Sequence, residues 1–482
     1  MPHGGGAADM DMAAMVADVL PEIVLVVGGI VVLLFALLAP RRWQSGAAIL
    51  ALVVVGLAAV TSGAMLGGME ALTSADTYAR DGVALWSKLI VLAVTAGVIG
   101  LSIPWFRSDP RHGEYYTLLL FSALGAILLA GATDLKEFVL ALLLSSATGF
   151  VLVAYHRQSS PASEAAIKYY LLGAFTSTSV LLGVALLFGL AGSTTLPGLA
   201  AGLDEHGGAA LIVGVALVVL ALAFKIGAVP VHAWMPDVAQ GAPAPVAAFV
   251  TSVPKVGGFI FLARLVLAIP PDALDWRPLI AVLAAATMTL GNLAALWQDD
   301  VRRLLGWSAV SQTGYGLMAV VALAGSELAV PALLFFLLAY VVANVAAFGV
   351  VVELRGRSAL DAYRGLTRAH PWLAAAIALS FLSFIGVPPL AGFFAKLLLF
   401  AVAIEVGYTW LAVVAAANTV VSIVYYVRVL APMYFGTIAG PVPVLGRWAS
   451  TVTLIFAIAT VVIGIAAEPF IHAFEAAQLV GR

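Results

Sequence analysis

The sequence lacks cysteine and has few charged residues. None of the 482 residues is cysteine, which excludes disulfides, a thiolate-held iron–sulfur cluster and a cysteine zinc site. Only 10% of the residues are charged, whereas 63% are hydrophobic, a composition far from that of a soluble domain. The glycines form no strand–GxGxxG–helix unit, so we expect no dinucleotide site.

Apolar runs long enough to cross a bilayer follow one another along the whole chain. A membrane-spanning helix needs about 20 apolar residues, and the sequence predicts fourteen such segments. They are 20–39, 46–68, 82–103, 114–132, 135–156, 165–190, 209–229, 242–270, 277–298, 303–324, 329–352, 372–404, 408–435 and 449–475. Nothing between them is long enough for a soluble domain. Residues 1–482 are therefore predicted to form one transmembrane domain, an all-α polytopic membrane protein.

The charges of the connecting loops predict the orientation. Alternate loops, here called arginine loops, carry arginine, and only the loop between segments seven and eight is uninformative. The arginines are Arg41 and Arg42; Arg107 and Arg111; Arg157; Arg302 and Arg303; Arg355, Arg357, Arg364 and Arg368; Arg447. The others, the acidic loops, carry mainly acids: Glu70, Asp76 and Asp81; Asp134 and Glu137; Asp204 and Glu205; Asp272 and Asp275; Glu327; Glu405. By the positive-inside rule the arginine loops face the cytoplasm of a bacterial inner membrane. An even number of spans then leaves both termini in the periplasm.

The chain has only six lysines, and four of them fall in or beside apolar segments. The six are Lys88, Lys136, Lys168, Lys225, Lys255 and Lys396. Lys88 and Lys136 lie near segment ends, where they could extend to the interface. A charge at the bilayer centre costs about 2.5–3.5 kcal/mol on insertion scales, so it usually faces a wet cavity or a partner. The other four are therefore candidate functional residues, although Lys168 has Glu164 one turn before it and could simply bond to it.

Two helix breaks in the sequence match each other. In "GAVPVHAWMPD" a glycine precedes Pro230 by three residues and Asp237 follows it by seven. In "GVPPLAGFFAK" a glycine precedes Pro389 by three residues and Lys396 follows it by seven. The separation of 159 residues, and the similar stretches "IKYYLL" and "LLFFLL", predict two five-helix repeats. Interrupted helices at matching places in inverted repeats indicate an ion path near the midplane.

We therefore predict repeats at 114–270 and 277–435, comprising segments four to eight and nine to thirteen, with broken segments seven and twelve. An odd number of spans in each repeat makes the two repeats inverted. A proline kink alone is the simpler explanation of one break. It explains two matching breaks beside ionisable groups less well.

Lysine suits proton transfer for a chemical reason. A lysine ammonium loses its proton more easily when it is desolvated or near another cation, and a nearby carboxylate has the opposite effect. Moving that carboxylate can therefore switch a lysine between holding and releasing a proton. His232, in the first break, could pass protons near neutral pH, although a hydrogen-bonded structural histidine is an equally good interpretation.

These motifs resemble those of the antiporter-like membrane subunits of proton-pumping NADH:quinone oxidoreductase, respiratory complex I, and among them the subunit N group. The resemblance extends from "LPEIVLVVGG" (20–29) to "NTVVSIVYYVRVLAPMYF" (418–435), nearly the whole chain. Its most specific parts are "EAAIKYYLLGAF" (164–175), "KIGAVPVHAWMPDVAQGAPAPVAAFVTSVPKVGGF" (225–259), "GNLAALWQDDVRRLLGWSAVSQTGYGLM" (291–318) and "GVPPLAGFFAKLLLF" (386–400).

The resemblance implies that Lys225 and Lys255 are the central lysines of a proton path, Lys396 the distal one and Lys168 the segment-six lysine. It also implies that this chain binds no cofactor. NADH, flavin, iron–sulfur clusters and quinone would be held by other subunits, and redox energy from them would drive proton transfer here. The expected partners are other antiporter-like and small membrane-arm subunits, in a lipid bilayer and without nucleic acid.

Two positions depart from the family pattern. The family has a glutamate in segment five that pairs with the segment-seven lysine, and Leu143 stands in its place here. Glu137 is the best candidate substitute, but it lies six residues away, about 9 Å along a helix and roughly 240° around it. The family also tends to have a histidine where this chain has Gln312. Glutamine can order water but cannot change charge near neutral pH.

Two other functions remain open on this sequence. A subunit of a multisubunit cation/proton antiporter, or of a hydrogenase-type complex, would share the lysines and the breaks. A structural module that has lost pumping and only joins its neighbours would explain the missing glutamate. The retained lysines and both breaks argue against that module.

Overall fold

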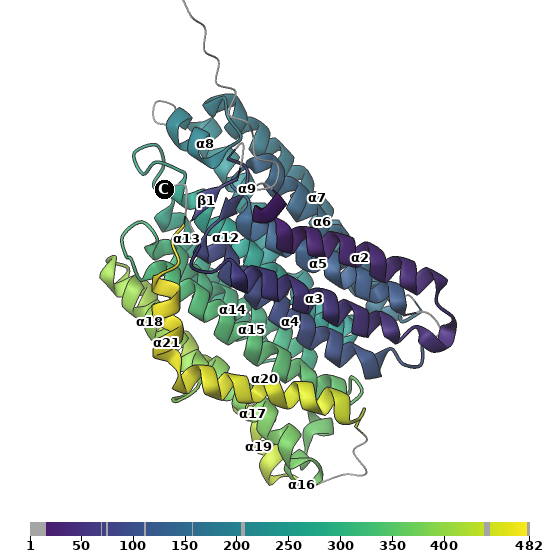
Figure 1. Ribbon diagram of the computed structural model, residues 1–482. Coiled ribbons are helices and arrows are strands. Elements are labelled where there is room, and N and C mark those ends of the chain that lie inside the picture. Colours follow the sequence, from purple (N-terminus) through teal and green to yellow (C-terminus); the bar gives the residue numbers. More distant parts are fainter. Residues whose placement is uncertain are drawn as a thin grey trace, which may run out of the picture.

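The computed structural model is almost entirely helical. It describes residues 16–68, 70–73, 76–109, 112–156, 158–203, 208–437 and 444–479. The helices that precede the first predicted repeat are α2 (Leu20–Leu38), η1 (Arg41–Trp43), α3 (Gly46–Ala64) and α4 (Gly82–Trp105), with a short antiparallel hairpin of β1 (Ala71–Leu72) and β2 (Ala79–Arg80) between α3 and α4. Figure 1 shows α2, α3 and α4 side by side at one edge of the bundle.

The two predicted repeats contain similar, though not identical, successions of helices. The first comprises α5 (Gly113–Gly131), α6 (Leu135–Val153), α7 (Ser160–Ala191), α8 (Leu196–Leu203), α9 (Ala209–Ile226), α10 (Trp234–Gly241), α11 (Ala244–Val250) and α12 (Val253–Leu267). The second comprises α13 (Arg277–Ala295), α14 (Val301–Ala322), α15 (Ala329–Glu353), η2 (Leu360–Tyr363), α16 (Leu366–Ala369), α17 (Pro371–Ile385), α18 (Ala391–Glu405) and α19 (Thr409–Phe435). The chain then continues through α20 (Arg447–Ile465) and α21 (Ala467–Glu475).

Packing between helices follows the same pattern in both halves. Helix α5 contacts α6 and α12, and α13 likewise contacts α14 and α19. Helix α7 contacts both parts of broken segment seven, α9 and α10, as α15 contacts both parts of broken segment twelve, α17 and α18. This agreement supports the proposed repeats. Helix α20 links the second repeat to the helices before the first, since it contacts α15, α17 and α18 and also α4 (Figure 1).

All fourteen predicted segments are present as a helix or a pair of helices. Among the described residues, twelve helical spans are long and apolar enough to cross a membrane. The other two segments are α14 and the broken pair α17 and α18. The sequence did not predict α8, the hairpin, or the interruptions that separate α11 from α12 and α20 from α21.

Both predicted breaks begin at a glycine with left-handed backbone. The φ angle is 79° at Gly227, directly after α9, and 93° at Gly386, directly after α17. L-residues rarely adopt this conformation, whereas glycine does so at little cost. At Gly227 space is restricted as well, because an added Cβ would lie 2.1 Å from Cε of Met235. Both helices therefore end inside the bundle.

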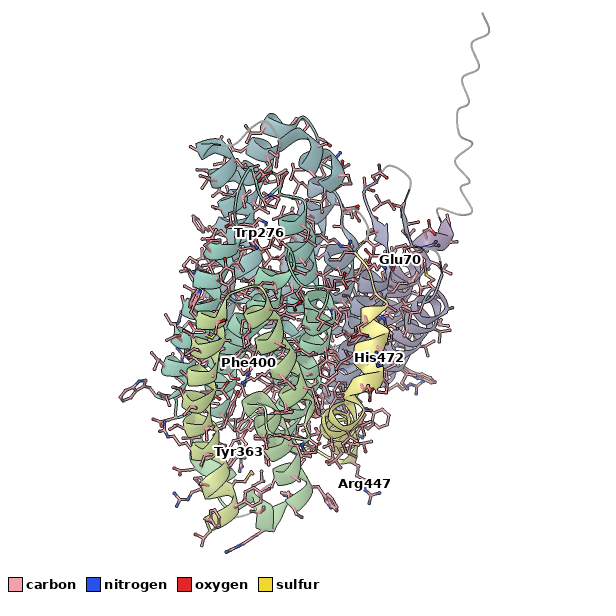
Figure 2. The ribbon with its side chains drawn as sticks, turned by 90° about the vertical axis from the view of Figure 1, so that its left-hand side faces the viewer. Glu70, Trp276, Tyr363, Phe400, Arg447 and His472 are labelled. Carbon is pink, nitrogen blue, oxygen red and sulfur yellow. The ribbon has the colours of Figure 1, made fainter. Side chains whose placement is uncertain are left out.

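The two kinds of loop lie at opposite ends of the bundle. Figure 2 shows Glu70 and Trp276, from acidic-loop regions, in its upper half, and Tyr363 and Arg447, from arginine-loop regions, at its lower end. Arg111, Arg157, Asp204 and Glu205 lie outside the described residues. The separation of the two ends agrees with the predicted alternation, and which end faces the cytoplasm stays a prediction.

Thiol labelling checks this orientation, because the chain contains no cysteine of its own. We expect Asp272→Cys, in an exposed acidic loop, to react with a membrane-impermeant maleimide added to intact cells. Ala359→Cys, in an exposed arginine loop, should react only after the cells are opened. Labelling of Ala359→Cys from outside would show that the orientation is reversed.

Candidate functional site

Three of the predicted lysines lie in the interior of the bundle. Lys225 is 1% exposed, Lys255 1% and Lys396 5%. At 1.5 Å per residue, Lys225 lies about 24 Å along α9 from its start, Lys255 about 18 Å from the end of α12, and Lys396 about 14 Å from the end of α18. In Figure 2, Phe400, one turn after Lys396, lies at a height between Trp276 and Tyr363. All three lysines are thus far from the ends of the bundle.

Lys225 and Lys255 belong to adjacent helices. The Nζ of Lys225 donates to Oγ of Ser146 on α6 at 3.2 Å. Gly258, one turn after Lys255 on α12, lies against the Lys225 stem, since a Cβ there would be 3.5 Å from Lys225 Cγ. The two lysines therefore project from packed helices, and Gly258 leaves space for the Lys225 stem.

A threonine of α14 links these two lysine sites. The Nζ of Lys255 donates to Oγ1 of Thr313 at 2.9 Å and to the carbonyl of Ala309 at 2.5 Å. Oγ1 of Thr313 is 2.7 Å from the carbonyl of Ile226, the residue after Lys225. A single hydroxyl thus contacts Lys255 and the backbone at Lys225.

Lys396 has its own set of neutral partners. Its Nζ donates to the carbonyl of Ile385, at the end of α17, at 3.1 Å and to Oγ1 of Thr419 at 3.3 Å. The ammonium lies 4.1 Å from the ring centroid of Tyr315, whose hydroxyl is 3.0 Å from Thr419 Oγ1. The second helix break therefore supplies a carbonyl to Lys396, because α17 ends there.

A small cavity lies beside the distal lysine, Lys396. Its lining includes Lys396, Gln312, Ser383 and Tyr340. Tyr340 also contacts the central site, because Nζ of Lys255 lies over its ring, 4.8 Å from the ring centroid. The cavity has about the minimum volume that one water needs. Gln312, which stands where the family tends to have histidine, donates to the carbonyl of Phe384 at 3.2 Å.

Lys168 lies apart from this row. Its side chain is 46% exposed and forms ion pairs with Glu164 at 2.7 Å and with Asp237 at 2.8 Å. Asp237 also pairs with Arg303 at the start of α14. The bond to Glu164, which the sequence suggested, is thus present. The structure gives Lys168 the surroundings of an ion-pair cluster that holds α10 between α7 and α14.

His232 lies in the first break, half-buried, with its ring centroid 5.6 Å from that of Trp307. Its Nδ1 is buried and has no hydrogen-bond partner among the described residues. The backbone of Pro230 also forms a hydrogen-bond contact with this ring, as it would in a structural histidine, and a role of His232 in proton transfer stays a proposal.

Glu137 lies in the first turn of α6, far from Lys225. Ser146, which contacts Lys225, is nine residues further along this helix, about 14 Å along the axis. Leu143 is 43% exposed on the outside of the chain. A direct contact between Glu137 and Lys225 is thus absent from the structure, as the helical spacing led us to expect, and Glu137 as a control on Lys225 stays a proposal.

Lys136 is exposed in the first turn of α6, as expected of a lysine that reaches the interface. Its Nζ is 3.7 Å from a carboxylate oxygen of Asp134. The same expectation is wrong for Lys88. Its side chain is fully buried and its Nζ lies 2.6 Å from Glu22 Oε1. A partner on α2, distant in the sequence from Lys88, holds this lysine inside.

Sequence reasoning missed the groups that connect the lysines: Ser146, Thr313, Tyr315, Tyr340 and Thr419. The "SQTGY" motif contains two of them beside Gln312. Ala309, Gln312 and Thr313 share one face of α14, because residues three and four apart on a helix are neighbours. That face is the element common to the central and distal lysine sites. Within the described residues no group of His, Asp and Glu side chains suits a metal ion.

A polytopic helical bundle with two broken helices and a row of buried lysines is the architecture of an antiporter-like transmembrane subunit. The family model for NADH:quinone oxidoreductase/Mrp antiporter, TM, matches residues 132–424. The chain belongs to this family.

Individual relatives agree with that assignment. The chain is 43% identical to NADH-quinone oxidoreductase subunit N of Mycobacterium sp. (strain JLS), over 89% of this chain and 91% of the relative. It superposes with a TM-score of 0.80 and 29% identity on a chain of respiratory complex I from Thermus thermophilus with bound aureothin, covering 95% and 100% of the two chains. A chain of the Mrp complex from Dietzia sp. DQ12-45-1b has the same fold, with a TM-score of 0.83 and 20% identity over 96% and 97%.

Proposed function

We propose that this chain is a non-redox, proton-translocating subunit in the membrane arm of a bacterial NADH:quinone oxidoreductase, in which Lys225, Lys255 and Lys396 carry protons. The main support is that the three lysines are buried and that their ammonium groups, among the described residues, hydrogen-bond only to hydroxyls and carbonyls. Because no ion pair has to break, a proton can leave such a lysine without leaving a buried carboxylate unpaired.

The contacts suggest an order of transfer. Thr313 Oγ1 can accept from Lys255 while it donates to the carbonyl beside Lys225. A water in the cavity lined by Gln312 would join the Lys255 and Lys396 sites, since Tyr340 borders both. His232 would pass protons at the first helix break. The energy for these transfers would come from quinone reduction by NADH in other subunits. The chain would lie in the inner membrane with both termini in the periplasm.

The subunits that copurify with this chain test the assignment. Extraction in a mild detergent with an affinity tag should bring down NADH dehydrogenase subunits, identified by mass spectrometry. Recovery of only cation/proton antiporter or hydrogenase subunits would instead place the chain with those relatives and overturn the proposal.

Gln312 provides a test of the connection between the central and distal sites. Gln312→Leu removes both polar atoms at similar size, so a water beside it loses its partner. We expect coupled NADH oxidation to fall severalfold, whereas Gln312→His should keep most of the activity, because histidine also orders water. Unchanged turnover in Gln312→Leu would mean that protons do not pass this cavity.

A structural module without pumping predicts a different result. In that case, variants of the buried lysines would assemble and leave proton yield unchanged. The neutral hydrogen-bond partners of the buried lysines and the α14 face shared by their sites both favour the pumping function.

A further inference from the structure

A second cluster of buried ionisable groups lies at the acidic-loop end, outside the lysine row. Lys88 is on α4 and its side chain is fully buried, with Nζ 2.6 Å from Oε1 of Glu22 on α2. The hydroxyl of Tyr78, from the hairpin segment, donates to the same carboxylate oxygen. Lys88 Nζ is also 5.2 Å from the centroid of the Tyr78 ring. Three elements thus converge on one carboxylate.

The other oxygen of this carboxylate is free to bind a proton. Oε2 of Glu22 is buried and has no hydrogen-bond partner among the described residues. Glu22 as a whole is 5% exposed. A buried carboxylate oxygen without a donor is costly unless a proton or a water occupies it.

Further charges face the cluster from the neighbouring helices. Glu137 on α6 is close enough to interact electrostatically with Glu22, Asp134 and Tyr78. Arg264 on α12 acts on Tyr78 in the same way, while it forms a buried ion pair with Asp81 at 2.8 Å. Burial and Glu22 raise the pKa of Tyr78 well above its usual value, so this hydroxyl stays a donor to the carboxylate.

An open cavity of about 400 Å³ ends one helical turn from Lys88. Its lining includes Glu70, Asp81, Leu85 and Trp86. Leu85 precedes Lys88 by three residues, so the two side chains lie on the same face of α4. Leu85 therefore lines the cavity on the same face of α4 that carries Lys88.

We propose that Glu22, Lys88 and Tyr78 form a proton-exchange site through which this subunit passes protons to or from water at its acidic-loop end. In the release direction, the Lys88 ammonium gives its proton to the Glu22 carboxylate, which leaves a neutral amine and a neutral acid. Glu22 then gives the proton to a water that enters past Leu85. Tyr78 holds the carboxylate between the two steps and keeps its own proton. The site rests on the proposed function of proton translocation.

A merely structural ion pair is the competing explanation. A buried pair is a weak source of stability, because desolvation of both ions offsets their attraction. Ionisable groups inside a membrane are rare and are candidates for functional sites. The same elements already have an ordinary brace in Asp18 and Arg80, which pair at 2.5 Å with side chains 18% and 24% exposed. This pair offers a matched control.

Neutral variants test the site in the assembled complex. We expect Glu22→Gln, and the double variant Glu22→Gln with Lys88→Met, to assemble and to lower proton-coupled NADH oxidation at least about tenfold. The pH profile of the remaining activity in Glu22→Gln should differ from the native profile, an effect that lost bracing does not produce. Asp18→Asn should keep native rates and profile. Native turnover, proton yield and pH profile in the double variant would overturn the proposal.

Thiol labelling tests water access without relying on pumping. Leu85→Cys in this cysteine-free chain should react with a small impermeant reagent from the acidic-loop side, and Val91→Cys, buried six residues deeper on α4, should not. Protection of Leu85→Cys from the reagent would overturn the proposed water access. This labelling result tests the proposal even if Glu22→Gln fails to assemble. If the proposed function itself were wrong, the result would be different: variants of Lys225 or Lys396 would show native proton pumping.

Discussion

Lys396→Met is expected to abolish coupled turnover in an assembled complex. Methionine fills similar space but cannot carry a proton, and the remaining partners at this site, Ile385 carbonyl and Thr419 hydroxyl, have no ionisable group. NADH oxidation and proton pumping should fall together by about tenfold or more, about 1.4 kcal/mol or more in the barrier. Both rates are measured in proteoliposomes with a pH-sensitive dye.

Arginine at the same position separates proton transfer from simple positive charge. Lys396→Arg keeps the charge over the Tyr315 ring, but a guanidinium does not release its proton in proteins. We expect it to remain nearly as slow as Lys396→Met. Full activity in Lys396→Arg would mean that position 396 needs only a cation and lies off the proton path.

Ser146→Asp is expected to arrest the relay by holding a proton on Lys225. Serine Oγ is 3.2 Å from Lys225 Nζ, and a carboxylate there would attract an ammonium by about 5 kcal/mol at an effective dielectric constant of about 20. A lysine held so strongly in its charged form cannot pass its proton on, so turnover should fall about tenfold or more. The same coupled assay measures it.

The neutral variant Ser146→Asn is the matched control, since it places an amide of the same shape beside Lys225. It should retain most of the native rate. If Ser146→Asp pumps normally, a fixed carboxylate does not control Lys225.

The segments and the two breaks could be predicted because they depend on local sequence. Long apolar runs must be helical in a bilayer, where every backbone group needs a partner. Gly227 and Gly386 end their helices through their own backbone preference. The matching spacing of glycine, proline and ionisable residues was sufficient to locate both breaks.

The links between lysines could not be predicted, because they depend on which helices meet. Thr313 reaches Lys255 and the Ile226 carbonyl across three helices, and no spacing within one segment reveals this. Lys88 near a segment end resembled an interfacial lysine, yet Glu22, 66 residues earlier in the sequence, holds it in the interior. Sequence reasoning thus identified candidate residues better than their partners.

The most direct test of the relay is a simultaneous measurement of NADH oxidation and proton translocation by reconstituted complex containing Lys225→Met. Lys136→Met is the control, since the Lys136 side chain is 69% exposed and far from the buried row. The relay predicts that Lys225→Met loses both activities together while Lys136→Met keeps both. Native NADH oxidation with the native number of protons per NADH in Lys225→Met would contradict it.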